Sequence, residues 1–204
     1  MKTKSENFMK PNLIRQRCFQ KVEILFLIFV CSLTQFHAEE NHKGSYTNLT
    51  EALKNPKDVQ ILYLGHSQLT TLPKEIGQLQ NLQILFLNYS ELNVLPEEIG
   101  QLKNLQALNL SASRIITLPK EIGQLQNLQL LNLQDNQLTT LPKEIGQLYK
   151  LQELDLGSNQ LATLPEEIKQ LQNLRELNLS DNPIASKERK RIRKLLPQCN
   201  IYFE

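Results

Sequence analysis

The segment Leu72-Pro-Lys-Glu-Ile-Gly-Gln-Leu79 decides the fold, because the chain repeats it at a fixed interval. Identical copies occupy residues 118–125 and 141–148, and near copies occupy 95–102 and 164–171. The proline of each copy lies 23 residues after the previous one. Proline at this interval excludes one long helix or a coiled coil, because its ring and its missing N–H interrupt the helical hydrogen bonds. Self-similarity at such a period is typical of a protein built from stacked units.

Aligned on this period, the chain divides into six units that begin at residues 59, 82, 105, 128, 151 and 174. Their shared pattern is L-x-x-L-x-L-x-x-N-x-L-x-x-L-P-x-E-I-x-x-L-x-x, as in residues 128–150. The alternation at the fourth to sixth positions predicts a short strand whose leucines point inward. The later Leu-Pro-x-Glu-Ile run places proline at the start of a short helical or 3-10 turn. One unit cannot bury its own leucines, whereas six stacked units can.

The pattern resembles the leucine-rich repeat family, and in detail the 23-residue LPxEIGxL type that is abundant in pathogenic spirochaetes. The resemblance covers residues 59–184 and implies an α/β leucine-rich repeat solenoid. Such a solenoid is a right-handed arc with a parallel sheet on its concave face and short helical or 3-10 segments on its convex face. The expected organisation is a signal peptide at 1–38, an N-terminal cap at 39–58, six repeats at 59–184 with the last one incomplete, and a C-terminal cap helix and edge strand at 185–204.

Composition and charge narrow the function. The 204 residues are 40% hydrophobic, which is consistent with a substantial core. Beyond residue 38 the chain carries 17 basic and 19 acidic residues, a net charge of −2, which argues against a nucleic-acid-binding surface. The sequence holds no tryptophan, three histidines and no phosphate-binding loop, dinucleotide fingerprint, H-E-x-x-H or C-x-x-C motif. We therefore expect no enzyme activity, no cofactor and no metal.

The first 38 residues predict an export signal. Six basic residues precede the uncharged run Ile24–Ala38, which is shorter than the roughly 20 apolar residues that span a bilayer. A signal peptide cleaved after Ala38 is therefore favoured over an uncleaved anchor. Acylation of Cys31, as in a bacterial lipoprotein, is the alternative, although bulky rather than small residues precede it. Cys199 would then remain in the mature chain and pack as a small hydrophobic residue.

Caps are expected to cover the two open ends of the stack. Residues 46–56 predict a short helix that Pro56 stops. The repeat fails after Ile184, and residues 186–196 predict a capping helix followed by an edge strand at 200–203. The residues expected to face the core are Leu49, Ala52 and Leu53 in the first helix and Ile192, Leu195 and Leu196 in the second. The basic run Lys187–Lys194 is expected to be the solvated face of this cap, with an anionic partner as the alternative.

The ninth position of each unit divides the chain into two halves. In the family this residue is an asparagine, which the resemblance implies forms a buried ladder of hydrogen bonds to neighbouring backbone. The last three units match with Asn136, Asn159 and Asn182, whereas the first three have Ser67, Ser90 and Ser113. Serine has a shorter reach and fewer hydrogen-bonding groups than asparagine. We therefore expect weaker ladder bonding and lower rigidity in the N-terminal half.

Positions two, three, five, seven and eight of each unit are expected to form the concave surface. Residues at one position of successive units should form a column with a spacing of about 4.8 Å. The N-terminal end is predicted to be a partner-binding patch with Ile61, Tyr63, His66, Ile84, Phe86 and Tyr89. Exposed, clustered aromatic residues are typical of binding hot spots. The alternatives are that the N-terminal cap or its loop covers them, or that they only support the sheet.

The C-terminal end of the concave surface is predicted to be acidic. Its candidate partner-binding residues are Asp135, Glu153, Asp155, Glu176 and Asp181. Glu153 and Glu176 should lie side by side and repel each other unless a cation or a basic partner covers them. Simple solvation of these acids is the alternative. Catalysis is disfavoured because an open sheet face has no cleft to raise a carboxyl pKa, and Ca²⁺ needs six or more converging oxygens.

The sequence thus predicts an exported, non-enzymatic leucine-rich repeat protein that binds a protein, or a glycan, through its concave face. By resemblance, the most concrete version is a secreted or surface-exposed adhesin or virulence-associated protein that binds a host cell-surface or extracellular-matrix protein. The alternative is a periplasmic or envelope scaffold that binds another bacterial protein. Neither version involves nucleic acid or a stable transmembrane helix in the mature form, and neither fixes the oligomeric state.

Overall fold

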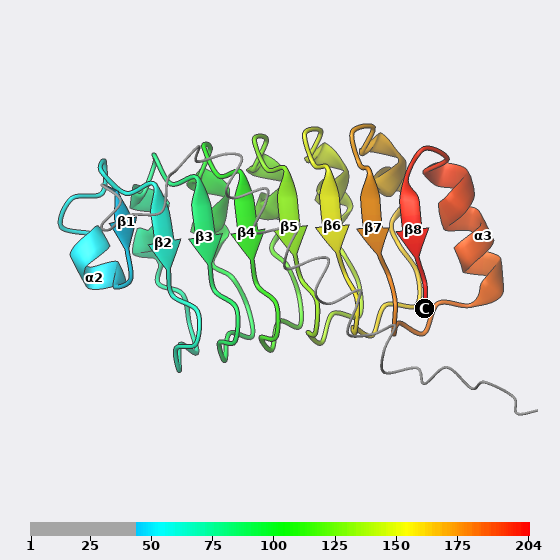
Figure 1. The fold of residues 1–204 in the computed structure, drawn as a ribbon, viewed down its shortest axis with the longest axis horizontal. Coiled ribbons are helices and arrows are strands. Elements are labelled where there is room, and N and C mark those ends of the chain that lie inside the picture. Colours follow the sequence, from blue (N-terminus) through cyan, green and yellow to red (C-terminus); the bar gives the residue numbers. More distant parts are fainter. Residues whose placement is uncertain (1–43) are drawn as a thin grey trace, which may run out of the picture. The chain divides into compact units, whose positions relative to one another are not determined.

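The computed structural model describes residues 44–204, in which eight short strands form one parallel sheet (Figure 1). The order of the strands in the sheet is their order in the chain. They are β1 (Ser45–Tyr46), β2 (Ile61–Tyr63), β3 (Ile84–Phe86), β4 (Ala107–Asn109), β5 (Leu130–Asn132), β6 (Glu153–Asp155), β7 (Glu176–Asn178) and β8 (Asn200–Tyr202). Strands β2–β7 occupy the third to fifth positions of their units, one residue earlier than predicted.

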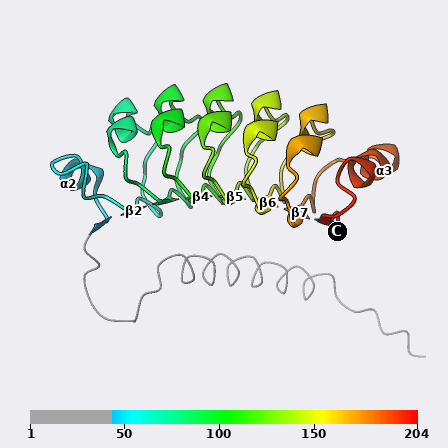
Figure 2. The ribbon, with the colours of Figure 1, turned by 90° about the horizontal axis from the view of Figure 1, so that it is seen from above.

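Each of the first five units returns through a five-residue 3-10 helix that starts directly after its proline. These helices are η1 (Lys74–Gln78), η2 (Glu97–Gln101), η3 (Lys120–Gln124), η4 (Lys143–Gln147) and η5 (Glu166–Gln170). The proline carbonyl accepts a hydrogen bond from the isoleucine three residues later, as Pro119 does from Ile122 at 3.1 Å. Figure 2 shows the sheet along the inner side of the curved stack and the 3-10 helices along its outer side. The predicted α/β solenoid is confirmed.

A glycine at the nineteenth position lets neighbouring 3-10 helices pack closely. A Cβ atom on Gly123 would lie 2.5 Å from the carbonyl oxygen of Glu144 in the next unit, which is too short for any contact. The fifth unit has Lys169 at this position. Its neighbour is helix α3 (Ser186–Leu195), so the close contact that requires glycine does not arise there.

The core is one continuous layer between the sheet and the 3-10 helices. The fourth position of every unit is a leucine that is at most 1% exposed, and these leucines are Leu62, Leu85, Leu108, Leu131, Leu154 and Leu177. Burial of one such side chain contributes about 1.5–3 kcal/mol. Because each leucine is covered partly by the units on either side, the stability of a unit depends on its neighbours.

The N-terminal cap differs from the prediction. Its helix α2 (Leu49–Ala52) is a single turn, which begins after Asn48 because the Asn48 side chain accepts the N–H of Glu51 at 3.2 Å. The preceding residues join the sheet as β1, and the carbonyl of Gly44 accepts the N–H of Ile61 at 3.1 Å. The predicted helical start at Tyr46 is therefore wrong. The core-facing residues are as expected, with Ala52 buried and Leu49 and Leu53 partly buried against the core.

The buried ladder at the ninth position differs between the two halves as expected. The Asn136 side chain accepts the N–H of Ile115 at 2.9 Å and donates to the carbonyls of Leu110 at 2.8 Å and Leu133 at 3.0 Å. Asn159 and Asn182 repeat this arrangement. Ser113 donates to a backbone carbonyl and lies 3.1 Å from Ser90. None of the three ladder serines accepts a backbone N–H within residues 44–204.

A second asparagine ladder, which the sequence analysis missed, lies at the last position of the units. Each side chain donates to a backbone carbonyl 24 residues earlier. The bonds are Asn81 to Lys57 at 2.7 Å, Asn104 to Gln80 at 2.9 Å, Asn127 to Lys103 at 2.8 Å and Asn173 to Tyr149 at 2.6 Å. Lys150 replaces asparagine in the fourth unit and donates to the Asn127 side chain at 2.7 Å. The recurrence of asparagine at this position was the signal available in the sequence.

The predicted leader, including Cys31, lies outside the described residues. Within residues 44–204, no helix is long and apolar enough to cross a membrane. Cys199 packs against the core as expected. Burial, with a smaller contribution from the charge of Glu176, raises the pKa of its thiol to about 12, which keeps the thiol protonated.

Candidate binding face

Side chains on the concave face form the predicted columns. The strand register aligns position three of the units as Ile61, Ile84, Ala107, Leu130, Glu153 and Glu176. It aligns position five as Tyr63, Phe86, Asn109, Asn132, Asp155 and Asn178, and Tyr202 of β8 continues that column. The face therefore changes from apolar and aromatic to acidic along the stack.

The aromatic residues of the first two units form two stacked pairs. The rings of Tyr63 and Phe86 have centroids 4.8 Å apart and planes 6° apart. The rings of His66 and Tyr89 have centroids 4.6 Å apart and planes 19° apart. Tyr63 is 40% exposed and Tyr89 is 44% exposed, so the cap residues 44–58 do not cover them. We call these four residues the aromatic patch.

Ile61 and Ile84, which were predicted to belong to this binding surface, are buried instead. They are 7% and 1% exposed, and Ala107 and Leu130 in the same column are also buried. Residues at one position of adjacent parallel strands lie about 4.8 Å apart and shield one another. This apolar column supports the aromatic patch and offers a partner little accessible surface.

The eighth position of every unit has a left-handed backbone. Its φ values lie between 50° and 57° for His66, Tyr89, Ala112, Asp135, Ser158 and Asp181. Asparagine, aspartate and histidine are enriched in this conformation, whereas most other side chains are strained in it by about 1–2 kcal/mol. The repeat pattern places His66 and Tyr89 on the surface, but the residue types do not indicate a left-handed backbone. A tyrosine at this position is therefore unfavourable for the backbone.

The acidic residues do not form one uniform surface. Asp135 and Asp181 are exposed, and Glu153 and Glu176 are partly buried partners in the register of β6 and β7. Burial raises the pKa of Glu153, and the charge of Glu176 raises it further, although Arg175 opposes both. The charge of Glu176 thus adds to the cost that burial places on ionising Glu153.

Asp155, which was predicted to contribute to the acidic binding surface, is only 5% exposed. One carboxylate oxygen accepts the N–H of Gly157 and the side-chain amide of Asn178, both at 2.9 Å. The other oxygen has no hydrogen-bond partner within residues 44–204. Burial raises the pKa of this carboxyl to about 6, against the lowering effect of the two hydrogen bonds. Asp155 is therefore a buried polar group and not an accessible contact residue.

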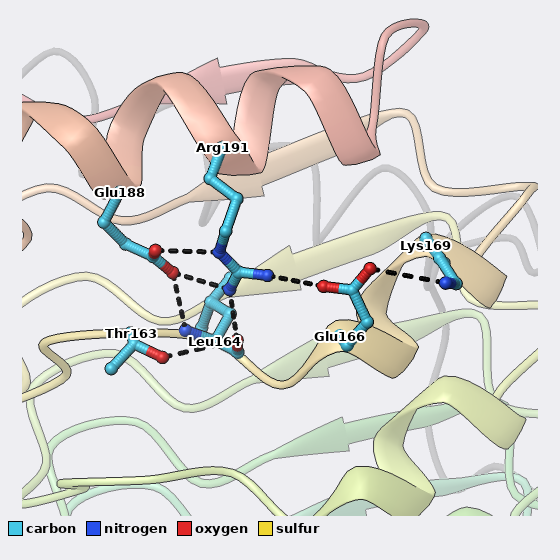
Figure 3. Close-up of polar contacts among 6 residues, drawn as sticks. All are labelled: Thr163, Leu164, Glu166, Lys169, Glu188 and Arg191. Carbon is cyan, nitrogen blue, oxygen red and sulfur yellow. Dashed lines mark hydrogen bonds and ion pairs between the residues drawn. The ribbon is translucent and has the colours of Figure 1, made fainter.

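The basic run in α3 holds the C-terminal cap in place. Figure 3 shows the Arg191 guanidinium between Glu188 and Glu166, with bonds of 2.7 Å and 2.8 Å, and next to the carbonyl of Leu164. The guanidinium carbons of Arg189 and Arg193 lie 5.3 Å and 5.1 Å from the ring centroid of Phe203. The expectation of a solvated face is therefore wrong for Arg189 and Arg191, which are partly buried, whereas Arg193 is exposed as expected. Ile192 and Leu196 face the core as predicted, and Leu195 is partly buried against it.

No group of three or more histidine, cysteine, aspartate or glutamate residues in the described part of the chain is arranged to hold a metal ion. The candidate site is the concave face, an open surface with an aromatic end and an acidic end. A regular sheet of this kind, with one exposed face of varied side chains, defines the class of repeat proteins that bind partners along a solenoid.

Comparisons with known proteins agree with this class. The leucine-rich repeat region model matches residues 104–197, and the leucine rich repeat model matches residues 57–115. A leucine-rich repeat protein of Leptospira interrogans is 53% identical with a TM-score of 0.73, over 76% of this chain and 39% of that one. No curated protein matches the chain. The chain is a leucine-rich repeat protein, and the Leptospira similarity supports a bacterial one.

Two further solved structures share the fold. The plant peptide hormone receptor RGFR1 in complex with RGF2 is 29% identical with a TM-score of 0.65, over 78% of this chain and 26% of that one. The structure of the Toll–Spatzle complex of Drosophila gives 30% identity and a TM-score of 0.60, over 63% of this chain and 18% of that one. This chain therefore spans less than half the length of each of the three structures. The leucine-rich repeat fold supports a role in protein–protein interaction.

Proposed function

We propose that this protein binds a protein partner through its concave face, with the aromatic patch as the main contact. The observation that carries the proposal is the pair of exposed ring stacks, Tyr63 on Phe86 and His66 on Tyr89. Aromatic residues are enriched among the residues that dominate binding energy. Tyr89 also has a left-handed backbone that is unfavourable for tyrosine, and such strain is found at functional sites.

The geometry of the stacks favours a protein over a glycan as the partner. Stacking covers one face of each ring, so the patch presents ring edges and the one uncovered face of Tyr89 that points toward Ala112. One open face gives a sugar little area for stacking, whereas peptide side chains can pack against ring edges as well as against that face. The two relatives named for their complexes, the receptor RGFR1 with RGF2 and Toll with Spatzle, support the same choice.

The proposed setting is the bacterial surface. The predicted signal peptide favours export, and the resemblance to the 23-residue LPxEIGxL repeats of pathogenic spirochaetes favours a host-facing adhesin or virulence-associated protein. A host cell-surface or extracellular-matrix protein is then the partner. The first test is the N-terminal residue and location of the native protein in culture medium, membrane and cytoplasm. A chain that begins at Glu39 in the medium supports export, and an intact chain in the cytoplasm overturns it.

Within this setting, cell-associated protein that begins at Glu39 would support the envelope scaffold instead. A lipidated N-terminus at Cys31 would support a tethered lipoprotein. Both outcomes leave the proposed concave binding face in place and change only the source of the partner. The partner panel must therefore hold extracellular-matrix proteins and envelope proteins of the same bacterium.

Substitution of the patch tests the binding proposal itself. The double variant Phe86→Asp, Tyr89→Asp should bind at least about 100-fold more weakly to whichever protein of the partner panel binds the wild type. The reason is that buried hot-spot residues contribute 2 kcal/mol or more each. The control is Val94→Asp with Ile116→Asp, which changes residues that are 51% and 45% exposed and lie in loops outside the concave face. Equal binding by the patch variant and the wild type would overturn the proposal.

A further inference from the structure

The eighth position forms a column of side chains beside the strands. All six residues share a left-handed backbone, and the N–H of one donates to the residue before the next, as Tyr89 does to the Ser111 carbonyl at 2.9 Å. The column therefore has the strand spacing, about 4.8 Å. Ser158 donates to the carboxylate of Asp181 at 3.4 Å, so side chains at adjacent places in the column reach each other.

The aromatic stack in this column stops at Tyr89. His66 covers one face of the Tyr89 ring. The next place holds Ala112, whose single methyl group is too small to cover the other face, and Tyr89 remains 44% exposed. The place after that holds Asp135, which is exposed and whose carboxylate has no hydrogen bond or ion pair with another residue of the described chain. A ring face and a carboxylate thus lie two strand spacings apart, about 10 Å, with only a small residue between them.

A planar cation about as thick as an aromatic ring fits the space above Ala112, between the Tyr89 ring face and the Asp135 carboxylate. A guanidinium above Ala112 would lie within the ~6 Å over which a cation interacts with a ring face. Its five N–H donors could also form a forked pair with the carboxylate on its other side. A lysine ammonium is compact and strongly hydrated and does not stack, and a neutral ring would leave Asp135 unpaired.

We propose that Tyr89, Ala112 and Asp135 bind one arginine side chain of the partner, stacked on Tyr89 and paired with Asp135. This proposal rests on the proposed function and identifies the chemistry that the partner must present. The net charge of −5 over residues 59–182 would attract such a cation. The chain already uses arginine against an aromatic ring in its C-terminal cap, where Arg189 and Arg193 lie over Phe203.

The backbone at Tyr89 supports a binding role for this residue. Its φ of 54° would suit asparagine or aspartate, which occupies the same place in two later units. A tyrosine here has a backbone cost that asparagine or aspartate avoids, and its ring face is the one feature that the smaller residues lack. Strain of this kind is found where a side chain serves binding.

The test uses the full chain and three small probes: N-acetyl-arginine amide, N-acetyl-lysine amide and N-acetyl-citrulline amide. Citrulline has nearly the shape of arginine without its charge. NMR shifts of the Tyr89 ring and the Asp135 carboxyl are followed against probe concentration. We expect saturable shifts with the arginine probe at millimolar concentration and at least fivefold weaker binding of the other two. Equal binding of all three probes, or no shift with arginine, overturns the proposal.

Two variants locate the probe. Asp135→Asn removes the charge, and Ala112→Tyr fills the proposed place with a ring at a backbone angle that Tyr89 already adopts. Both should weaken the arginine probe at least fivefold. Asp181→Asn makes the same charge change at the same position of the last unit and should leave binding unchanged. If Ala112→Tyr fails to fold, the comparison of Asp135→Asn with Asp181→Asn decides. Equal loss of affinity for the arginine probe in these two variants overturns the site.

The two proposals fail in different ways. In one outcome, the Phe86→Asp, Tyr89→Asp variant no longer binds the panel partner, and the wild type does not bind the arginine probe. This result supports the concave interface and contradicts the arginine site. In the other outcome, the wild type binds the arginine probe, and the Phe86→Asp, Tyr89→Asp variant still binds the panel partner as well as the wild type does. This result supports the arginine site but shows that the partner does not use it. If Asp135→Asn loses binding of both the arginine probe and the panel partner, the arginine site is part of the partner interface.

Discussion

The first three repeats and the last three follow one pattern but satisfy it to different degrees. In residues 128–196 the ladder position is asparagine and the left-handed position is aspartate or serine. In residues 59–127 the ladder position is serine and the left-handed position holds histidine, tyrosine and alanine. The half that meets the requirements of the fold less well is the half that carries the aromatic patch. The eighth position therefore belongs both to the requirements of the fold and to the proposed binding surface.

The largest difference between the halves should appear at the ladder. Asn159→Ala removes one accepted and three donated hydrogen bonds and leaves buried backbone groups unpaired, at a cost of about 3–4 kcal/mol. Ser113→Ala, its counterpart in the third unit, should cost only about 1 kcal/mol. Urea unfolding of both variants gives the two values. Equal losses of unfolding free energy would show that the two halves have equally strong ladders, which would contradict the proposed difference between them.

The C-terminal half also depends on its cap. Arg191→Ala should destabilise the chain by about 2 kcal/mol, because charge-assisted bonds to Glu188 and Glu166 and a bond to a backbone carbonyl are lost together. Hydrogen exchange should rise across residues 186–204. Lys190→Ala changes an exposed residue of the same helix and should move stability by less than about 0.5 kcal/mol. Arg191→Lys keeps the charge without the forked geometry and should restore less than half of the loss.

The cap has a defined pH dependence. Hydrogen bonding from Arg191 lowers the pKa of Glu188 below its ordinary value of 4.5. A carboxyl whose folded pKa is lowered stabilises the protein above its unfolded pKa, and this contribution is lost as the pH falls through the folded pKa. Arg191→Ala should therefore destabilise the protein most at neutral pH, with a smaller effect below pH 4.5. An effect that does not depend on pH would assign the loss to packing alone.

Most of the fold could be predicted because the repeat constrains it many times over. The proline interval and the inward leucines determine the units and the position of the 3-10 helices, and the resemblance to leucine-rich repeats implies the parallel sheet. The N-terminal cap occurs once, without repetition to support the assignment, and its first residues joined the sheet instead of a helix. The sequence does not indicate the role of Arg191, because its partner Glu166 lies 25 residues earlier.

The candidate site could be predicted only in outline. The columns, the aromatic end and the acidic end follow from the period, and Tyr63, Phe86, His66 and Tyr89 do come together. Burial on the face could not be predicted, because Ile84 and Asp155 are covered by neighbours at the same position of adjacent strands. The strained backbone at Tyr89 has no signal in the residue types, since tyrosine is not a residue expected in that conformation.

Asp155 is a destabilising residue in the otherwise regular C-terminal half, and replacing it should increase the difference in stability between the two halves. The same column has asparagine at positions 109, 132 and 178. Asp155→Asn should therefore stabilise the protein at pH 7–8 by about 1.5 kcal/mol, because it removes a buried charge with an unpaired oxygen. Urea unfolding at pH 8 gives the gain. Asp135→Asn, at an exposed residue, should change stability by less than about 0.5 kcal/mol.

The sign of the pH dependence is fixed by the raised pKa of Asp155. In the folded state its carboxyl has a pKa of about 6, whereas its ordinary value is 3.8. Above pH 6 the folded wild type holds the buried charge and the variant has its full advantage. Between pH 6 and 3.8 the folded wild type takes up a proton, so the advantage shrinks, and it vanishes below 3.8. A gain that is constant from pH 8 to pH 3.5 would contradict this account.

The smallest predicted effect concerns the left-handed position in the N-terminal half. Ala112→Asn should stabilise the chain by about 1 kcal/mol, because asparagine tolerates a φ of 50° and alanine does not. Tyr89→Asn gains the same relief but loses the stack on His66, worth about 0.5–1.5 kcal/mol, so its net change should be close to zero. Thermal unfolding of the two variants isolates the stacking energy as their difference. If Tyr89→Asn stays as stable as the wild type while the arginine probe no longer binds, the tyrosine serves binding and not the fold. A clear destabilisation by Tyr89→Asn would instead make the aromatic patch part of the architecture of the N-terminal half.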